Sequence, residues 1–497
     1  MVRLRSGGGG GEGASAAGRA RSPAAWRCVA LVFAALVAGS AAASAVDLAP
    51  SADHVLELQS SGGELAWPEL PPACAAPPRC TLLLEVELVS GRARPRVVIA
   101  AAGSGFEQQF APRTRGRRYV DLGPLHDLTP GSRVQLSARG GRIAAPRRLL
   151  VFEDPDLDGR RVLVLAPHPD DAEIAAFGLY AGTDSDVVTV TAGDAGGFNY
   201  RVLFADPQEH YRIKGRIRTW DSITVPRLGG VTPERARNLG FYDATLARMW
   251  RQRPEPVAPP IAALDDPSEF RRLNVAARLR DEALQPTWQG LVADLVAELR
   301  AVRPDVVVAP HPLLDAHSDH AFTTVALLEA LEALASHAAP ERGDGPKAGE
   351  RAEESLSSPL LLLYTNHMVG AEPWPYGERE ARVGPPPLDA VEGLDPAWLG
   401  RIHSRPLDEP TRAMKILALE MMHDLRPLDL QDRKSAPEEW REALRATTRA
   451  LRRERPSYSY LRRAPRPNEL YFVLDAEQAQ RAVDEFLRRF EARQGAR

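Results

Sequence analysis

The chain has 497 residues, 44% of them hydrophobic, and nearly balanced charges, with 63 Lys and Arg against 66 Asp and Glu. This length exceeds that of one ordinary domain and predicts two or three, with enough apolar content for a core. The formal net charge of −3 gives no indication of a nucleic-acid partner or of an anionic-membrane surface.

The first 46 residues predict an export signal. Arginines among Gly, Ser and Ala precede a short apolar run at 28–38, and Ala-Ser-Ala at 43–45 fits a cleavage site. An uncleaved signal anchor is the alternative, because 28–46 approaches the length of a short membrane span. Both forms place the remaining chain outside the cytoplasm, in the periplasm or another extracytoplasmic compartment, and the second would also anchor it to a membrane.

Residues 47–158 predict a small antiparallel β-sandwich. Apolar or alternating segments separated by Gly, Pro and Ser occur at 81–88, 96–100, 118–122, 134–138 and 148–152. No aromatic platform for a glycan stands out, so we expect a spacer domain. Cys74 and Cys80 lie close together in an exported chain, and we expect them to form a small disulfide loop.

The stretch 161–182 (RVLVLAPHPDDAEIAAFGLYAG) predicts a buried strand, a tight polar loop and a helix. Its run of Val and Leu ends at two prolines, which cannot donate to a sheet ladder. His168, Asp170 and Asp171 therefore follow at the carboxyl end of a strand, where open α/β sheets carry ligand sites. Alone, such residues are more often turn formers and a helix cap.

A second stretch repeats this arrangement. The apolar run 305–309 is followed by a loop that contains His317 and His320 and leads into an apolar helix. Two strand ends on one sheet can aim His168, Asp171 and His320 at one point. Three nitrogen and oxygen ligands with a fourth position for water are typical of a catalytic zinc site, and no Cys lies nearby to close it.

After residue 159, strands and helices alternate. Strands are expected at 187–191 and 305–309, and helices at 208–223 and 291–302. This alternation predicts an α/β domain over 159–497, with a doubly wound, Rossmann-like sheet in three layers. Residues 337–358 contain few apolar side chains and are predicted to be a disordered surface loop, and 437–455 a charged helix.

HPDDAE at 168–173 and HSDH at 317–320 resemble the HPDD-x-E and H-x-D-H motifs of the LmbE/PIG-L family of zinc-dependent N-acetylglucosamine deacetylases. The resemblance extends over roughly 160–474. Further similar segments are TAGDAGG at 191–197, residues 218–229, LGFYD at 239–243 and MKILALEMMH at 414–423. Ser318 stands where the family usually has Pro, which alters the stiffness of the loop but none of the ligands.

The resemblance implies a role for each motif residue. His168, Asp171 and His320 would be the zinc ligands, and Asp170 would be the general base. His317 would assist at the oxyanion or at the leaving nitrogen. The implied fold is the LmbE-like three-layer domain described above, and the implied cofactor is Zn²⁺.

Four further residues match the family, but each has an ordinary structural alternative. Arg218 and Asp243 would contact the substrate, although Arg218 could pair with Asp221 three positions away, and Asp243 could belong to a turn. Asp319 could orient a ligating His, or simply be favoured near a helix N-terminus. His423 could support the site from behind the ligands or lie in the core.

The expected reaction is hydrolysis of an acetamide, which releases acetate and a free amine. Zinc polarises the amide carbonyl and lowers the pKa of bound water to about 7. Asp170 could accept the proton of the water, and His317 as imidazolium could stabilise the oxyanion or protonate the amine. We expect the substrate to be an N-acetylated amino sugar or glycoconjugate, such as an envelope or exported polysaccharide.

Two other functions fit the same sequence. One is a zinc amidase that cleaves another amide-linked sugar conjugate, because the carbonyl chemistry is the same and only the pocket differs. The other is a catalytically silent glycan-binding or scaffold protein. The complete set of motif residues argues against this loss of catalysis.

Overall fold

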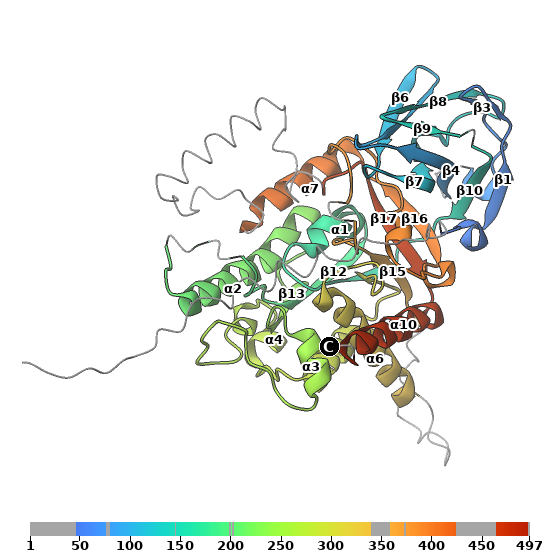
Figure 1. Cartoon of the computed structure of the whole chain (residues 1–497). Helices are drawn as coiled ribbons and strands as arrows, with labels where there is room; N and C mark the ends of the chain where they lie inside the picture. Colours follow the sequence, from blue (N-terminus) through green and yellow to red (C-terminus); the bar gives the residue numbers. More distant parts are fainter. Residues whose placement is uncertain are drawn as a thin grey trace, which may run out of the picture. The chain divides into compact units, whose positions relative to one another are not determined.

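The computed structural model describes residues 46–75, 80–144, 146–197, 200, 203–338, 358–371, 374–423 and 464–495. Within these ranges the chain has a mixed α/β fold with three β-sheets (Figure 1). Residues 45–497 cluster as one structural unit. The predicted α/β fold class is therefore confirmed.

The N-terminal part of the described chain contains two antiparallel sheets. The first has the order β1-β10-β4-β7 with β9 beside β4, and the second has the order β2-β3-β8-β5-β6. Their strands are β1 (His54–Glu57), β2 (Ser60–Ser61), β3 (Glu64–Ala66), β4 (Cys80–Ser90), β5 (Arg96–Ala101), β6 (Ser104–Gln109), β7 (Arg115–Asp121), β8 (Arg133–Arg139), β9 (Gly141–Ile143) and β10 (Arg148–Glu153). The expected disulfide between Cys74 and Cys80 is present.

The third sheet has seven strands in the order β13-β12-β11-β14-β15-β17-β16. They are β11 (Arg161–Ala166), β12 (Asp184–Thr191), β13 (Ala236–Phe241), β14 (Val306–Pro310), β15 (Leu360–Tyr364), β16 (Arg401–Pro406) and β17 (Asn468–Leu474). The strands from β13 to β15 are parallel, whereas β17 is antiparallel to both neighbours. The chain order reverses between β11 and β14, and the carboxyl ends of strands at such a switch point open toward a ligand.

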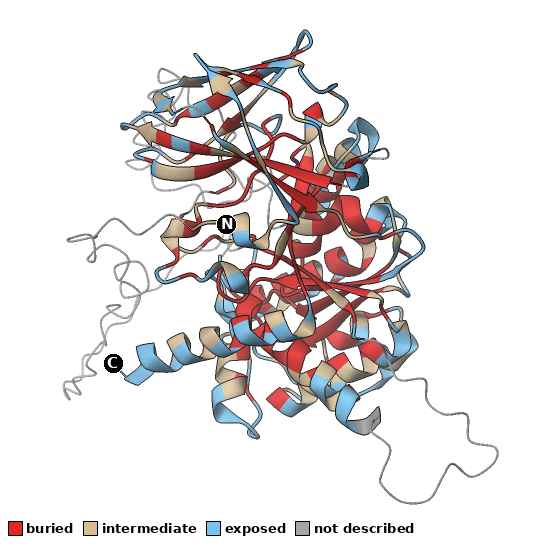
Figure 2. Cartoon of the chain, turned by 90° about the vertical axis from the view of Figure 1, so that its right-hand side faces the viewer, coloured by how far each residue is buried: buried red, intermediate tan, exposed pale blue. Residues whose placement is uncertain are grey.

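Helices cover both faces of this sheet. They are α1 (Asp171–Ala181), α2 (Pro207–Thr224), α3 (Leu246–Gln252), α4 (Ala277–Asp281), α5 (Trp288–Val302), α6 (Ser318–Ala338), α7 (Glu409–Met421) and α10 (Ala476–Gly495). In β11, Leu163 and Leu165 pack in one cluster with α5, α6 and α10, whereas Val162 and Val164 pack in another with α1 and α7. Figure 2 accordingly shows buried residues along the strands and exposed ones on the outer sides of the helices.

Short 3₁₀ helices connect several elements. They are η1 (Ala49–Ser51), η2 (Pro72–Cys74), η3 (Gly123–Leu125), η4 (Val225–Gly229), η5 (Arg271–Leu273), η6 (Leu388–Ala390) and η7 (Pro396–Trp398). Among the described residues, no helix has both the length and the apolar character that crossing a membrane requires. The predicted export signal, most of the loop predicted at 337–358 and the helix predicted at 437–455 lie outside the described residues.

Asp121, at the end of β7, joins the N-terminal sheets to the seven-stranded sheet. Its fully buried carboxylate accepts hydrogen bonds from the guanidinium of Arg382, with Oδ1 lying 3.1 Å from Nε and 3.0 Å from Nη2. Its Oδ2 accepts from Nδ2 of Asn468 at 3.2 Å and from the hydroxyl of Ser404. One buried charge therefore holds β16 and β17 against the first sheet.

Replacing Asp121 by Ala is expected to lower the free energy of unfolding by about 3–5 kcal/mol, because Arg382 then remains buried without its counter-charge. Urea denaturation followed by circular dichroism measures this change. The matched control is Asp127→Ala, since the Asp127 side chain is 89% exposed and its loss should cost less than about 0.5 kcal/mol. Equal stabilities of the two variants would contradict the role of Asp121.

Candidate functional site

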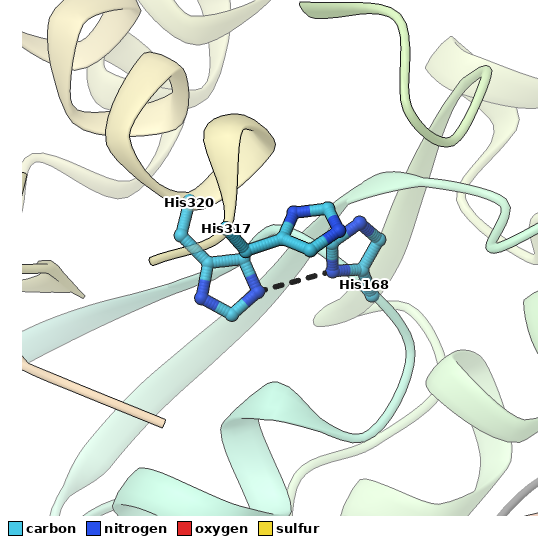
Figure 3. Close-up of side chains that lie close together, drawn as sticks. All are labelled: His168, His317 and His320. Atoms are coloured by element: carbon cyan, nitrogen blue, oxygen red, sulfur yellow. Dashed lines mark hydrogen bonds between the residues drawn. The ribbon is translucent and has the colours of Figure 1, made fainter. Parts of the chain in front are cut away.

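Three lone-pair atoms from the two predicted loops meet in the interior. Nδ1 of His168 lies 3.1 Å from Nε2 of His320. Oδ2 of Asp171 lies 3.2 Å from that nitrogen of His168 and 3.1 Å from that of His320. All three residues are buried, and Figure 3 shows the imidazoles of His168 and His320 with the ring of His317 beside them.

The sheet explains why these residues meet. His168 follows β11, Asp171 is the first residue of α1, and His320 lies in the first turn of α6 after β14. Strands β11 and β14 are parallel neighbours, with Val162 opposite Val306. Their carboxyl ends therefore lie side by side, and the loops that follow place their side chains over the same point.

The outer nitrogens of both imidazoles face carboxylates. Nε2 of His168 lies 3.0 Å from Oδ1 of Asp243, and Nδ1 of His320 lies 3.0 Å from Oδ2 of Asp315. These contacts are ion-pair contacts and not aligned hydrogen bonds. They favour a proton on each outer nitrogen, which leaves the inner nitrogens with the lone pairs that a metal requires.

Asp171 is held in place by both of its oxygens. Oδ1 accepts a hydrogen bond from Nδ2 of Asn366 at 2.7 Å, and Oδ2 accepts one from the backbone N–H of His168 at 2.9 Å. The remaining lone pair of Oδ2 is directed between the two imidazoles. The carboxylate is therefore oriented before any ligand binds, as ligands in metal sites usually are.

The three atoms fit a zinc ion. Ligands at 2.0–2.1 Å from a tetrahedral zinc are about 3.3–3.4 Å apart, close to the 3.1–3.2 Å seen here. Three lone pairs in mutual contact repel unless a proton or a metal cation lies among them. The surrounding charge also favours a cation: five carboxylates gather here (Asp170, Asp171, Asp243, Asp315 and Asp319), and the guanidinium of Arg218 pairs with Asp170.

The pKa values reflect this excess of negative charge. Burial lowers the pKa of His320, but the carboxylates of Asp171 and Asp315 outweigh burial and raise that pKa to about 10. Burial likewise opposes ionisation of Asp171, yet His320 and His168 hold its pKa well below the ordinary range. Without metal the site thus keeps protons on its imidazoles, and metal binding must displace them.

Asp170 has a strained backbone and does not cap α1. Its φ of 117° lies in a region that side chains rarely adopt, and its side chain makes no capping hydrogen bond. Its Oδ2 instead accepts a hydrogen bond from Nη2 of Arg218 at 2.9 Å. Arg218 also donates to the carbonyl of Pro169 at 2.5 Å, and a Cβ at Gly193 would lie 2.5 Å from its Nη1. The Asp170 carboxylate is therefore held by Arg218 and not by the N-terminus of α1.

His317 lies beside the ligands and is neutral. Burial and the neighbouring His168 and His320 lower the pKa of His317 to about 4. Its Nδ1 accepts a hydrogen bond from the backbone N–H of Asp319 at 3.3 Å, so the proton of the neutral ring is on Nε2. The imidazolium expected from the sequence is thus disfavoured before the reaction, and His317 offers a neutral N–H donor instead.

The residues assigned to substrate binding make protein contacts. Asp243 faces His168, and Arg218 holds Asp170, so each orients a residue of the site. Asp319 lies 3.5 Å from Nε2 of His168 and accepts hydrogen bonds from the backbone N–H groups of Ala244 and Leu246. It supports the loop that carries Asp243, whereas direct contact of Arg218 or Asp243 with substrate stays a prediction.

His423 pairs with Asp221 of α2. Its Nδ1 lies 2.7 Å from Oδ1 of Asp221, and its side chain is half exposed. Asp221 forms an ion pair with His423, and Arg218 forms one with Asp170.

The sequence reasoning missed the partners of the ligands. Asp315 lies in the loop between β14 and α6, and its Oδ2 faces His320 and accepts the backbone N–H of Asn366 at 2.9 Å. Asn366 follows β15 and orients Asp171. The available signal was a polar residue directly after a third parallel strand, which places Asn366 at the same edge of the sheet.

Asp194 is a buried carboxyl next to the site. Its Oδ1 accepts the backbone N–H of Asp243 at 2.8 Å, and Oδ2 has no hydrogen-bond partner within the described residues. Burial and the nearby charge of Asp243 raise the pKa of Asp194 to about 7. A protonated Oδ2 avoids the cost of a buried, unpaired charge.

The stability of the metal-free protein should therefore depend on Asp194. Because its folded pKa lies above the unfolded value near 4, the folded state binds more protons, and stability falls as pH rises from about 4 to about 7. Asp194→Asn removes this loss. As pH rises from about 4 to about 7, the free energy of unfolding of the variant should therefore increase by roughly 2–4 kcal/mol relative to that of the parent. Urea denaturation at each pH measures this difference. The control Asp265→Asn, in an exposed loop, should follow the parent.

Metal content tests the three ligands directly. Purified protein is expected to hold about one zinc per chain by elemental analysis, and Asp171→Ala or His320→Ala should hold little, because two ligands remain. His311→Gln is the matched control, since His311 is also a buried strand-end histidine but faces the carbonyl of Trp398. Equal zinc in Asp171→Ala and His311→Gln would remove Asp171 from the site.

A comparison with protein families finds a match that covers both motifs but is shorter than the expected resemblance over 160–474. The model of the PIG-L family, described as GlcNAc-PI de-N-acetylase, matches residues 163–331. No curated protein matches the chain in sequence.

Similar solved structures have low identity to the chain. N,N'-diacetylchitobiose deacetylase from Pyrococcus horikoshii is 17% identical with a TM-score of 0.31, over 65% of this chain and 88% of that one. The A40926 pseudoaglycone deacetylase Dbv21 is 18% identical with a TM-score of 0.31, over 64% and 98%. The 4-carboxy-2-hydroxymuconate hydratase GalB from Pseudomonas putida is 14% identical with a TM-score of 0.30, over 64% and 95%. Values this low carry no argument about the reaction.

The family match spans both strand-end loops. It begins within β11, just before His168, and ends within α6, beyond His320. The residues that meet in the interior are therefore those of the matched segment. Residues 163–331 therefore match the PIG-L (LmbE-like) family model, as the two motifs predict.

Proposed function

We propose that this protein is a zinc-dependent hydrolase that removes the acetyl group from an N-acetylated amino sugar. The observation that carries the proposal is the meeting of His168 Nδ1, Asp171 Oδ2 and His320 Nε2 beside a carboxylate that does not ligate, Asp170. The family match supports an enzyme that acts on an amide bond. The N-acetylated sugar is the substrate class that the family description names.

Each residue of the site has a separate role in the proposed hydrolysis. His168, Asp171 and His320 would hold zinc, which when bound supplies the Lewis acidity that polarises the amide carbonyl and acidifies water. Asp170, fixed by Arg218, accepts the proton of the attacking water. Nε2–H of His317 donates to the carbonyl oxygen as negative charge develops there.

The departing amine needs a proton. Asp170 holds the proton taken from water and lies on the same loop as the ligands, so it can return that proton to the nitrogen. In this proposal Nε2–H of His317 already donates to the carbonyl oxygen, so His317 would need a second proton before it could protonate the amine. Proton return by Asp170 is therefore the favoured route.

The proposal also includes the architecture of the two parts of the chain and the compartment in which the protein acts. We interpret the sheets of residues 47–158 as a β-sandwich, supported by one buried cluster that contains Leu84 and Val86 of the first sheet and Val97 and Ile99 of the second. The strand order of the large sheet supports a doubly wound, Rossmann-like domain from residue 159. The disulfide supports an oxidising, extracytoplasmic compartment, and therefore an export signal.

Release of acetate tests the proposal. Zinc-loaded protein is incubated with N-acetylglucosamine, its short oligomers and an N-acetylated polysaccharide, and acetate and free amine are measured. Equal amounts of both are expected, and loss after chelation should be reversed by added zinc. Release of an amine with an acid other than acetate would favour the alternative zinc amidase. Zinc binding without any release would favour the silent glycan-binding protein.

Asp170→Asn should keep zinc and lose turnover by about 10²–10⁴-fold, because the amide cannot accept a proton. Metal analysis and acetate release are measured on the same preparation, with Asp265→Asn as control. Unchanged kcat in Asp170→Asn would exclude Asp170 as the base. Loss of zinc together with turnover would instead make Asp170 part of the metal site.

A further inference from the structure

Three loops meet at one end of the N-terminal sheets, between β4 and β5, between β6 and β7, and between β8 and β9. The backbone N–H of Arg113 donates to the carbonyl of Gly91 at 2.6 Å. A Cβ at Gly140 would lie 3.3 Å from the carbonyl oxygen of Arg94. We name this surface the arginine end, after the residues of these loops and the adjoining strand ends: Arg92, Arg94, Arg96, Arg113, Arg115, Arg139 and Arg142.

The arginine end is strongly basic in a chain whose net charge is −3. Residues 92–142 contain ten arginines and no lysine against three acids, Glu107, Asp121 and Asp127. Arg96 pairs with Glu107 at 3.0 Å, and Glu87 is an exposed acid beside this surface. Within the described residues, five of its exposed arginines have no ion pair: Arg92, Arg113, Arg115, Arg139 and Arg142.

The strand register brings like charges together. Arg115 on β7 and Arg142 on β9 are both Cα partners of Val89 on β4, so they point to the same face about 10 Å apart. On the other sheet, Arg96 of β5 and Arg139 of β8 are direct cross-strand partners. Like charges directly opposite each other destabilise a sheet. An anion bound between these side chains would relieve the repulsion.

We propose that the arginine end binds a polysaccharide that carries carboxylate, sulfate or phosphate groups. Guanidinium groups bind such anions with two parallel hydrogen bonds, and several spaced along two sheets suit a polymer with repeated charges. None of the exposed large apolar side chains in the described chain belongs to these loops, which argues against insertion into a membrane. No exposed aromatic ring is available there for stacking nucleic-acid bases.

This site is separate from the metal centre and does not need it for binding. If the bound polymer is also the substrate, a point that rests on the proposed function, the arginine end would hold the chain while the metal centre acts on one of its sugars. Removing the arginines would then raise KM for the polymer and leave KM for a small N-acetylated sugar unchanged.

Fluorescently labelled heparin is the probe, because it is a polysaccharide with regular sulfate and carboxylate groups. The test variant is Arg115→Gln, Arg139→Gln and Arg142→Gln combined. The matched control combines Arg227→Gln, Arg300→Gln and Arg493→Gln, three exposed arginines on separate elements with the same total change in charge. Affinities of the full chain are measured by fluorescence anisotropy over a series of salt concentrations, and thermal melting shows that both variants fold.

The parent is expected to bind heparin with an affinity that falls steeply with salt. The test variant should bind at least tenfold more weakly, and the slope of log affinity against log salt should fall by about two to three. The control variant should stay within about twofold of the parent. Absence of binding by the parent at low salt, or equal weakening in both variants, would overturn the proposal.

Three further ligands separate polysaccharide from other partners. Neutral dextran should not bind. Vesicles of phosphatidylglycerol or a DNA duplex that bound more tightly than heparin, with the same dependence on these arginines, would overturn the proposal in favour of a membrane or a nucleic acid. Heparin binding that survives removal of zinc, in a protein without deacetylase activity, would contradict only the proposed function.

Discussion

The contact among His168 Nδ1, Asp171 Oδ2 and His320 Nε2 is the constraint on which the catalytic half of the molecule depends. Three buried lone pairs separated by 3.1–3.2 Å are unstable unless a proton or a metal cation lies among them. The parallel pairing of β11 with β14 brings the two loops together, and the carboxylates of Asp243 and Asp315 keep the imidazoles turned toward one another. The fold thus contains a preformed site that favours binding of a positive charge.

The strain at Asp170 follows from the same requirement. A φ of 117° turns the side chain of Asp170 toward Arg218, at a cost of roughly 1–3 kcal/mol. The hydrogen bonds that Arg218 makes with Asp170 and with the carbonyl of Pro169 offset this cost. The carboxylates of Asp170 and Asp171 therefore point to different partners, Arg218 and the two imidazoles, as the proposed division between base and ligand requires.

Local patterns in the sequence predicted the parts of the site that lie on single loops. HPDD and HSDH each follow an apolar run, and a strand that ends in polar residues predicts an edge of an α/β sheet. What the patterns could not predict were partners that depend on which strands are neighbours. Asn366 reaches Asp171 because β15 lies beside β14, and Asp221 meets His423 because α2 and the end of α7 come together. Spacing along one helix suggested only a partner within that helix for Arg218, whereas the structure pairs it with Asp170 on another loop.

The N-terminal sheets are more than a spacer in packing terms. Along β4, Leu82 and Leu84 point into the cluster between the two N-terminal sheets, whereas Leu83 belongs to the cluster that also contains Leu163 and Leu165 of β11. The first sheet is therefore buried on both faces, and its outer face forms part of the core beside the large sheet. Removing residues 46–158 would expose that core and leave Arg382 without Asp121. The loops at the arginine end lie beyond the strands and do not form part of this core. Their charged side chains could therefore bind a partner without any change to the packing of the core.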